Sequence, residues 1–229
     1  YDVTTLTILR YIKWFALDEL TQAPVLFQHN ISVMMKRNLG HVKGNTKLHV
    51  ILGEVGVPFD MDLGGHNQSY TASTMALDRT IQAVEANDLD YVLWNYTADN
   101  TNECGDNWNG EDLSLRTKTE NRALLVAVRP FVKCIPFDLE IISQQFDPSR
   151  ITKQYVLKVQ WKGVANTENA PHAVYMYLPH FHYSNPIISV SGSPKSTTRY
   201  DLSRQTLIWE NIVKEECEMV LSVSNQITK

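Results

Sequence analysis

Residues 48–62 read LHVILGEVGVPFDMD, and the fold is best approached from this stretch. Residues 48–52 form a short apolar run with β-branched members, which is typical of a buried parallel strand. Glu54 follows Gly53, and Gly56 and Pro58 then break the backbone. The pattern predicts a strand that ends in a loop and carries a carboxylate at its C-terminal end. Because an isolated carboxylate is costly to bury, Glu54 is either catalytic, as at the C-terminal edge of a barrel, or a loop residue paired with an Arg.

Two segments carry a family resemblance. Residues 53–62 (GEVGVPFDMD) resemble a signature of family five glycoside hydrolases, in the endoglycoceramidase-related branch of fungal glucosylceramidases and steryl glucosidases. Residues 93–96 (LWNY) and 105–114 (GDNWNGEDLS) resemble the strand-eight segment of the same branch. The resemblance extends over nearly the whole chain. It implies an α/β plus all-β protein, namely the C-terminal part of a (β/α)8 TIM barrel followed by a small β-sandwich domain.

The same resemblance implies a set of site residues. Glu54 matches the catalytic nucleophile, and Tyr1 matches a Tyr that hydrogen-bonds it, although Tyr1 is alternatively only a frayed terminus. Trp94 matches the aromatic floor beneath the sugar, where an indole offers a stacking face. The expected substrate-binding residues are Trp94, Asp60, Asp62, Asn100 and Trp108. No cofactor and no metal are implied, and grouping Asp60 and Asp62 with His66 as metal ligands is the weaker interpretation.

The chain also departs from the family pattern. The family's acid/base Glu lies in an Asn-Glu-Pro motif, which does not occur here, and Asn102-Glu103 is followed by Cys104. The catalytic pair is therefore incomplete, and the chain alone is predicted to be inactive. Relatives commonly read Ser-His-Glu-Trp-Gly where residues 101–105 read TNECG. That change bears on the substrate range rather than on the chemistry.

Periodicity predicts two domains, residues 1–120 and 121–229, with a polar boundary at 118–121. In the first, apolar spacing predicts helices over residues 4–20, 31–39 and 74–87, the last capped by Ser73 or Thr74. A strand is predicted over residues 89–94, and residues 97–114 form a polar loop. In the second, apolar and polar residues alternate over 155–161, 174–178 and 217–223, which predicts a β-sandwich.

Several residues invite a metal or disulfide interpretation. His180 and His182 could bind a metal as neighbours on one strand face, but they lack a third ligand and are interpreted as structural. The odd number of cysteines, with no metal-ligand spacing, favours thiols, with one disulfide as the minor alternative. The cysteines are Cys104, Cys134 and Cys217.

Composition excludes some functions and favours one location. The net charge of −4 gives no basic footprint for nucleic acid, and no apolar run reaches the length of a membrane span. The first residue is not Met and no secretory signal follows, so we expect a preceding segment. Sequons occur at Asn30, Asn67 and Asn95, but a glycan on Asn95 would block the site. A cytoplasmic or peripheral membrane location is therefore favoured over secretion.

The functional hypothesis is a retaining β-glycosidase, of which this chain is the C-terminal part. The expected substrate is a glucolipid, either glucosylceramide or a steryl glucoside. The expected partners are the missing N-terminal half of the barrel and a membrane surface, with no nucleic acid. The alternative is a non-catalytic fragment or partner chain that acts in binding or assembly, and a lectin-like role for the sandwich is a third hypothesis.

Overall fold

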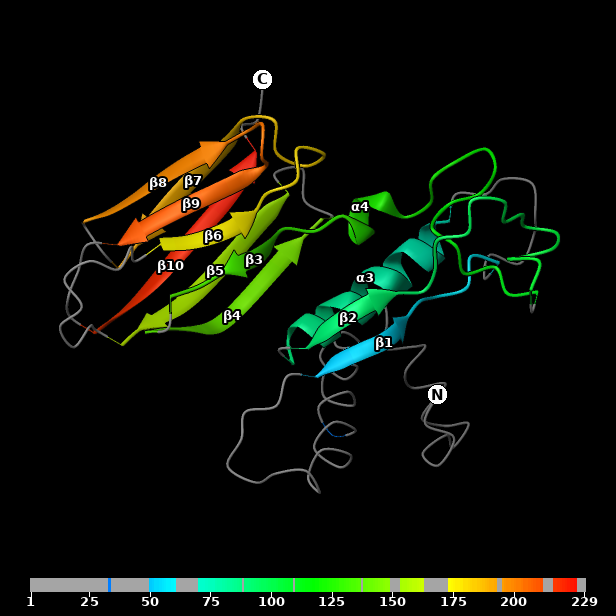
Figure 1. Cartoon of the computed structure of the whole chain (residues 1–229), viewed down its shortest axis with the longest axis horizontal. Helices are drawn as coiled ribbons and strands as arrows, with labels where there is room; N and C mark the ends of the chain where they lie inside the picture. Colours follow the sequence, from blue (N-terminus) through cyan, green and yellow to red (C-terminus); the bar gives the residue numbers. More distant parts are fainter. Residues whose placement is uncertain are drawn as a thin grey trace. The chain divides into compact units, whose positions relative to one another are not determined.

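The structure is a computed structural model that divides the chain into two compact units, Tyr1–Ala123 and Leu124–Lys229. Among the described residues, most of the elements are strands, and the helices shown are one long and one short (Figure 1). The helices predicted over residues 4–20 and 31–39 lie outside the described residues, apart from Val33. The described residues are 33, 50–60, 70–87, 89–108, 110–136, 138–148, 153–162, 173–192, 195–211 and 216–225.

The first unit contains a strand–helix–strand segment. Strand β1 (Ile51–Val55) pairs in parallel with β2 (Asp90–Leu93), and helix α3 (Thr71–Glu85) lies between them in sequence. The parallel direction of β1 confirms the sequence interpretation, but its predicted burial is wrong. Ile51 is 63% exposed, because β2 is the only sheet neighbour of β1 within the described part of the chain.

Helix α3 begins at Thr71, three residues earlier than predicted. Its N-cap is Tyr70, which has a left-handed backbone (φ 47°) and forms no side-chain cap hydrogen bond. The predicted cap by Ser73 or Thr74 is wrong because the Ser73 hydroxyl donates to the Pro58 carbonyl (2.9 Å) instead. The predicted inward face is confirmed, since the side chains of Leu77, Ile81 and Val84 are buried.

The polar segment 118–121 is a hydrogen-bonded turn within the first unit. The Thr117 amide donates to the Glu120 carbonyl (2.9 Å), and the Thr117 hydroxyl accepts from the Glu120 amide (3.1 Å). Beyond the turn, the Arg122 amide donates to the Leu115 carbonyl (2.8 Å). The chain therefore returns to the first unit before the division after Ala123.

The second unit consists of the short helix α4 (Leu124–Ala127) and two four-stranded antiparallel sheets. One sheet has the order β4–β5–β10–β7, and its strands are Leu139–Asp147, Gln154–Trp161, Cys217–Asn225 and Pro186–Ser191. The other has the order β3–β6–β9–β8, and its strands are Phe131–Cys134, Ala173–Tyr177, Thr206–Asn211 and Ser196–Asp201.

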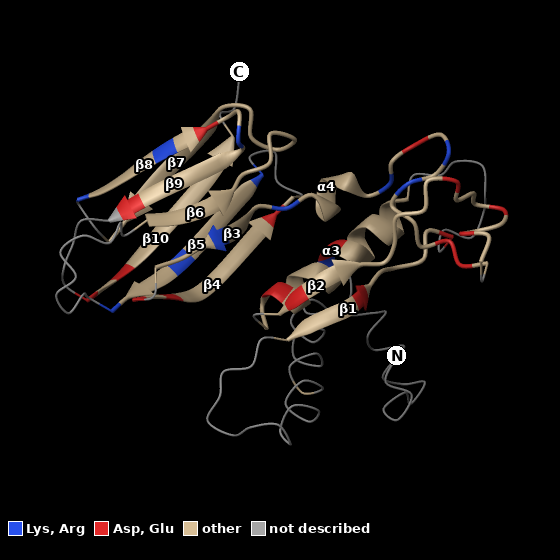
Figure 2. Cartoon of the chain, in the orientation of Figure 1, with Lys and Arg blue, Asp and Glu red and all other residues tan. Residues whose placement is uncertain are grey.

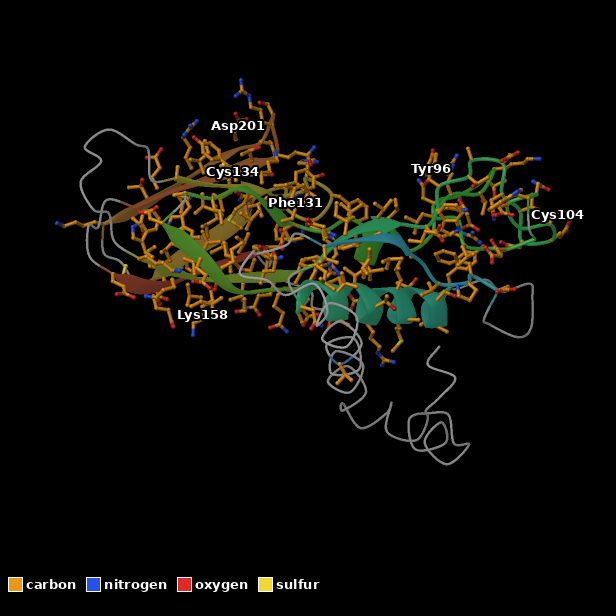
Figure 3. All side chains as sticks on the ribbon, turned by 60° about the horizontal axis from the view of Figure 1, so that its bottom comes forward. Tyr96, Cys104, Phe131, Cys134, Lys158 and Asp201 are labelled. Atoms are coloured by element: carbon orange, nitrogen blue, oxygen red, sulfur yellow. The ribbon has the colours of Figure 1, made fainter. Side chains whose placement is uncertain are left out.

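The alternating residues of both sheets form one hydrophobic core. The predicted inward positions of β5 and β10 are buried, and Cys217 packs against the same core. Phe131 and Cys134 lie on one outer side of the unit and Lys158 on the other (Figure 3). The core side chains include Tyr155, Leu157, Val159, Trp161, Val174, Met176, Leu207, Trp209, Met219, Leu221 and Val223.

The two histidines do not share a strand face, so that part of the sequence interpretation is wrong. His180 and His182 lie in the turn between β6 and β7. His180 is exposed, whereas His182 is buried and its Nε2 is 2.7 Å from the Val128 carbonyl oxygen. The three cysteines form no disulfide with one another, as predicted. None of the described helices has the length and apolar character that crossing a membrane requires.

Candidate active site

Glu54 is the next-to-last residue of β1, and its side chain is exposed. Leu52 pairs with Tyr91 and Val55 pairs with Leu93, so β1 holds one more residue than β2 between these two pairs. This irregularity is a β-bulge, a feature that redirects side chains next to functional sites. Gly53 and Glu54 lie within the bulge, at the C-terminal end of a parallel strand. The structure thus presents this carboxylate to solvent at the edge where the sequence placed it.

Trp94 is the first residue after β2 and lies beside the end of β1. Its amide donates to the Val55 carbonyl (2.8 Å), and its side chain is half-buried. The Trp94–Asn95 peptide bond is cis. Gly56 has no room for a side chain, because a Cβ at this position would lie 2.1 Å from the Trp94 carbonyl oxygen. The backbone of the loop after β1 therefore packs directly against Trp94.

Trp108 lies next to Trp94, although fourteen residues separate them in sequence. The ring centroids are 6.5 Å apart and the ring planes are inclined by 59°. Trp108 is 77% exposed and Tyr96 is 73% exposed, so the aromatic surface continues outward from Trp94. Tyr96 and Cys104 both lie on the loop that follows β2 (Figure 3). The predicted aromatic residues Trp94 and Trp108 are thus brought together.

Two consecutive tight turns, closed by Thr101 with Gly105 and by Asp106 with Glu111, hold Trp108 in place. Thr101 and Gly105 exchange two backbone hydrogen bonds (2.8 and 3.1 Å), and the Asp106 amide donates to the Glu111 carbonyl (2.9 Å). The Trp108 amide donates to Asp106 Oδ1 (3.0 Å). Gly105 has φ +60°, and a Cβ there would lie 2.6 Å from the Glu111 carbonyl oxygen. The turn therefore requires glycine at this position.

The loops that surround the aromatic pair are acidic (Figure 2). No Lys or Arg occurs in residues 80–115. Asp60, a predicted substrate-binding residue, is exposed on the loop after β1. Asn100 is different, because its side chain is completely buried and its Nδ2 donates to Asp112 Oδ1 (2.7 Å). Asn100 therefore supports the loop instead of offering its amide to solvent.

Sequence reasoning missed a buried cation under these loops. Arg122 is 1% exposed and makes a bidentate ion pair with Asp112, with Nη2–Oδ1 at 2.7 Å and Nη1–Oδ2 at 3.0 Å. Its guanidinium lies over the ring of Phe59, 4.2 Å from the centroid. Phe59 is therefore a packing residue and is unavailable as an apolar contact for ligand. The sequence did hold a signal for this cation. The Asp and Glu residues of segment 85–112 have no Lys or Arg within that segment, so a cation for a buried one must come from elsewhere in the chain.

Tyr70 completes this buried cluster. Its hydroxyl donates to Glu120 Oε1 (2.8 Å) and accepts from Asn102 Nδ2 (3.1 Å). Burial, together with the negative charge of Glu120, raises the pKa of Tyr70 above its ordinary value of 10. Tyr70 is therefore neutral and acts as a hydrogen-bonding and packing residue across the pH range of ordinary assays.

Two predicted site residues, Tyr1 and Asp62, lie outside the described residues, as does His66. Within the described ranges, no group of three His, Cys, Asp or Glu residues is arranged to hold a metal ion. The described site therefore offers one exposed carboxylate at a strand end, a tilted pair of indole rings and an acidic rim. Such a set can bind a neutral polar ligand by stacking and by hydrogen bonds to carboxylates.

Comparisons with known proteins find homologues of this chain among glycosidases. No family model matches the chain. A glucosylceramidase of Rhizopus delemar is 27% identical over 168 residues, which are 62% of this chain and 23% of the relative. An ergosteryl-beta-glucosidase of Saccharomyces cerevisiae is 36% identical over 101 residues, which are 41% of this chain and 13% of the relative. This chain therefore spans less than a quarter of each of these two relatives.

Comparison with solved structures shows that the fold of this chain is also similar to that of glycosidases. Sterylglucosidase 1 of Cryptococcus neoformans superposes with a TM-score of 0.71 at 25% identity, over 89% of this chain and 32% of that protein. Endo-glycoceramidase II from a Rhodococcus species superposes with a TM-score of 0.56 at 14% identity, over 89% of this chain and 39% of that protein, and shares the fold alone. The chain is a homologue of part of the glycosidases named glucosylceramidase and ergosteryl-beta-glucosidase, which confirms the family resemblance predicted from residues 53–62, 93–96 and 105–114.

Proposed function

We propose that this chain is the C-terminal part of a retaining β-glycosidase that hydrolyses the glucosyl bond of a glucolipid. The observation that carries the proposal is the position of Glu54, an exposed carboxylate in a bulge at the end of β1. The proposal is supported by the backbone hydrogen bond from the Trp94 amide to the carbonyl of Val55, the residue that follows Glu54. In the proposed complete protein, β1, α3 and β2 belong to the last part of a TIM barrel, and the two-sheet unit is an appended β-sandwich.

The proposed chemistry assigns one step to each group. The Glu54 carboxylate attacks the anomeric carbon and forms a glycosyl-enzyme ester as the bond to the aglycone oxygen breaks. A second carboxyl group, contributed by another part of the protein and about 5–5.5 Å from the first, protonates the leaving oxygen. The same group then takes a proton from the water that releases glucose. Trp94 stacks against the sugar ring and holds the anomeric carbon near Glu54.

The direct test is turnover of a glucoside by the full-length protein that contains this chain. Glu54→Gln keeps the shape of the side chain and removes the nucleophile, so kcat should fall by at least about 10³-fold. The matched control is Glu210→Gln, which alters an exposed carboxylate on β9 and should leave kcat within about twofold, because surface changes are usually small. Near-normal kcat in Glu54→Gln would refute the assignment.

We infer a lipid aglycone from the exposed aromatic surface. A cleft for a long glucan needs aromatic platforms along several subsites, whereas the exposed aromatics of this loop are Trp108 and Tyr96. Stacking of one glucose on Trp94 leaves further affinity to come from apolar aglycone surface, at about 25 cal/mol per Å². We therefore expect kcat/KM to be higher for a steryl or ceramide glucoside than for cellotetraose, with detergent held constant. Equal or higher efficiency on cellotetraose would contradict the lipid proposal.

A second candidate is a non-catalytic chain that acts in assembly. It is favoured by the exposure of Ile51 (63%) and Val92 (52%), one apolar residue on each strand of the β1–β2 sheet. Exposed apolar residues on strands of a small sheet invite pairing with a partner. If the full-length protein with Glu54 intact turned over no glucoside while the chain bound a second polypeptide, this candidate would replace the first.

A further inference from the structure

We propose that Arg122 is a positioning residue for the site, which fixes the loop after β1 and the loop after β2 in one arrangement. The inference rests on the proposed function, because it gives Arg122 a role in placing the groups that would bind the sugar. Its side chain has no solvent exposure. Arg122 therefore acts through its neighbours and does not touch the substrate.

The guanidinium joins several parts of the loop after β2. Besides the pair of hydrogen bonds to Asp112, Nη1 donates to Asn102 Oδ1 (3.0 Å). Nε donates to the Ser114 carbonyl (2.9 Å), and Nη2 also donates to that carbonyl. Three groups of the segment 102–114, namely the Asp112 carboxylate, the Asn102 side-chain amide and the Ser114 carbonyl, thus depend on one cation. Because these bonds converge on a planar fork, they restrict the direction of the segment as well as its distance.

The same guanidinium also reaches the loop after β1 and the start of α3. It lies over the rings of Phe59 (4.2 Å to the centroid) and Tyr70 (5.3 Å). These two rings pack edge to face at 5.8 Å. The Phe59 amide donates to the Asp112 carbonyl (2.7 Å), so Asp112 connects both loops through its backbone and its carboxylate.

Asp112 transmits this restraint to the aromatic surface. It directly follows Glu111, whose carbonyl closes the turn that contains Trp108. The Asp112 carboxylate also accepts from Asn100 Nδ2, and Asn100 directly precedes the first turn, at Thr101. Fixing Asp112 therefore fixes both ends of the two-turn segment, and with them the place of Trp108 next to Trp94. Without Arg122, the Asp112 carboxylate would be a buried charge with no cation, and the two turns would shift to solvate it.

Lysine cannot replace arginine in this role. A guanidinium carries five N–H donors in a rigid plane, and its face can stack on aromatic rings. An ammonium has three donors and no plane. Arg122→Lys thus keeps the charge that Asp112 needs but loses the fork and the stacking on Phe59, which makes it a sharper test than a truncation that unfolds the protein. The matched control is Arg116→Lys. Arg116 lies six residues before Arg122 in the chain, and its Nη1 donates to Asn121 Oδ1 at the surface (3.2 Å).

The experiment measures amide hydrogen exchange and glucoside turnover for both variants in the full-length protein, well below the melting temperature. For Arg122→Lys we expect exchange in residues 97–114 to rise at least about tenfold above the Arg116→Lys control, because the segment opens locally. Exchange in β5 and β10 should be unchanged. We expect kcat/KM, corrected for the folded fraction, to fall by about 10- to 100-fold, mainly through KM, because the binding groups are misplaced.

Two results would overturn the inference. Exchange in residues 97–114 equal to that of the control would show that Arg122 does not hold the loop. A uniform rise in amide exchange over α3, β1 and β2 as well as residues 97–114 would show that Arg122 stabilises the whole first unit and does not specifically position the loops. The exchange measurement does not depend on turnover. If the unaltered protein hydrolysed no glucoside, the proposed function would fail while the exchange result still decided whether Arg122 fixes the two loops.

Discussion

Replacing Gly56 by alanine should disturb the candidate site much more than the same replacement at Gly53. A Cβ at Gly56 would lie 2.1 Å from the Trp94 carbonyl oxygen, whereas ordinary contacts begin at 3.4 Å, so one backbone must move by more than an ångström. Gly56 and Trp94 directly follow the paired strands β1 and β2, and the hydrogen bond from the Trp94 amide to the Val55 carbonyl holds their backbones together. Overpacking of this kind costs about 1–3 kcal/mol. The expected result is a fall in Tm of the first unit by roughly 5–20 °C.

Gly53→Ala is the matched control, because Gly53 has no atom within 4 Å of a Cβ built there. Both substitutions reduce the freedom of the unfolded chain to the same extent, so the difference between them isolates the contact with Trp94. Calorimetry of the two variants gives the stability difference. The chain has five tryptophans, so the Trp94 signal is taken as the difference in fluorescence between each variant and the same variant carrying Trp94→Phe, and this difference reports displacement of the indole. Equal melting temperatures for Gly56→Ala and Gly53→Ala would refute the reasoning that Gly56 positions Trp94.

Two further predictions concern the second unit. Leu221→Ala removes a completely buried side chain of β10 and should lower the free energy of unfolding by about 2–5 kcal/mol, whereas Ile142→Ala, at an exposed position of β4, should change it by less than about 0.5 kcal/mol; equal losses in urea titrations would contradict the position of the core. Burial lowers the pKa of His182 below 6.5, so the fold favours the neutral ring, and its contribution to stability should be present above pH 6.5 and decline as the pH falls below it. Unfolding titrations between pH 7.5 and 4.5 should show a shallower decline for His182→Gln, and an identical decline would argue against the buried neutral ring.

Local patterns predicted the elements whose burial follows a simple period. The alternation of apolar and polar residues in β5 and β10 could be recognised in the sequence because each strand has one face in the core, as Tyr155, Leu157 and Val159 show for β5. The apolar positions of α3 were predicted for the same reason. The start of α3 was not, because the cap preference of Ser73 was overridden by its hydrogen bond to Pro58. Tertiary contacts that compete with a local preference leave no periodic signal.

The site was only partly predictable. Motifs singled out Glu54, Trp94 and Trp108 as candidates, and the structure places Trp94 beside both β1 and Trp108. The bulge that presents Glu54 depends on the register with β2, which the sequence of β1 alone does not contain. The partner of Arg122 depends on how a long loop folds back, so the pairing with Asp112 required coordinates. Asn100 and Asp112 show the same limit, since both lie in a segment predicted as a polar loop, with Asn100 expected to bind substrate, and both side chains are buried.

The most direct test of the central claim is to trap the reaction intermediate. The full-length protein is incubated with a 2-deoxy-2-fluoro-glucoside that carries an activated leaving group, and the labelled peptide is identified by mass spectrometry. A retaining enzyme forms a covalent glycosyl ester under these conditions. We predict that the fluoroglucosyl group is found on Glu54, within the peptide that contains residues 51–60. Labelling of a different carboxylate, or hydrolysis with inversion and no covalent species, would contradict the account.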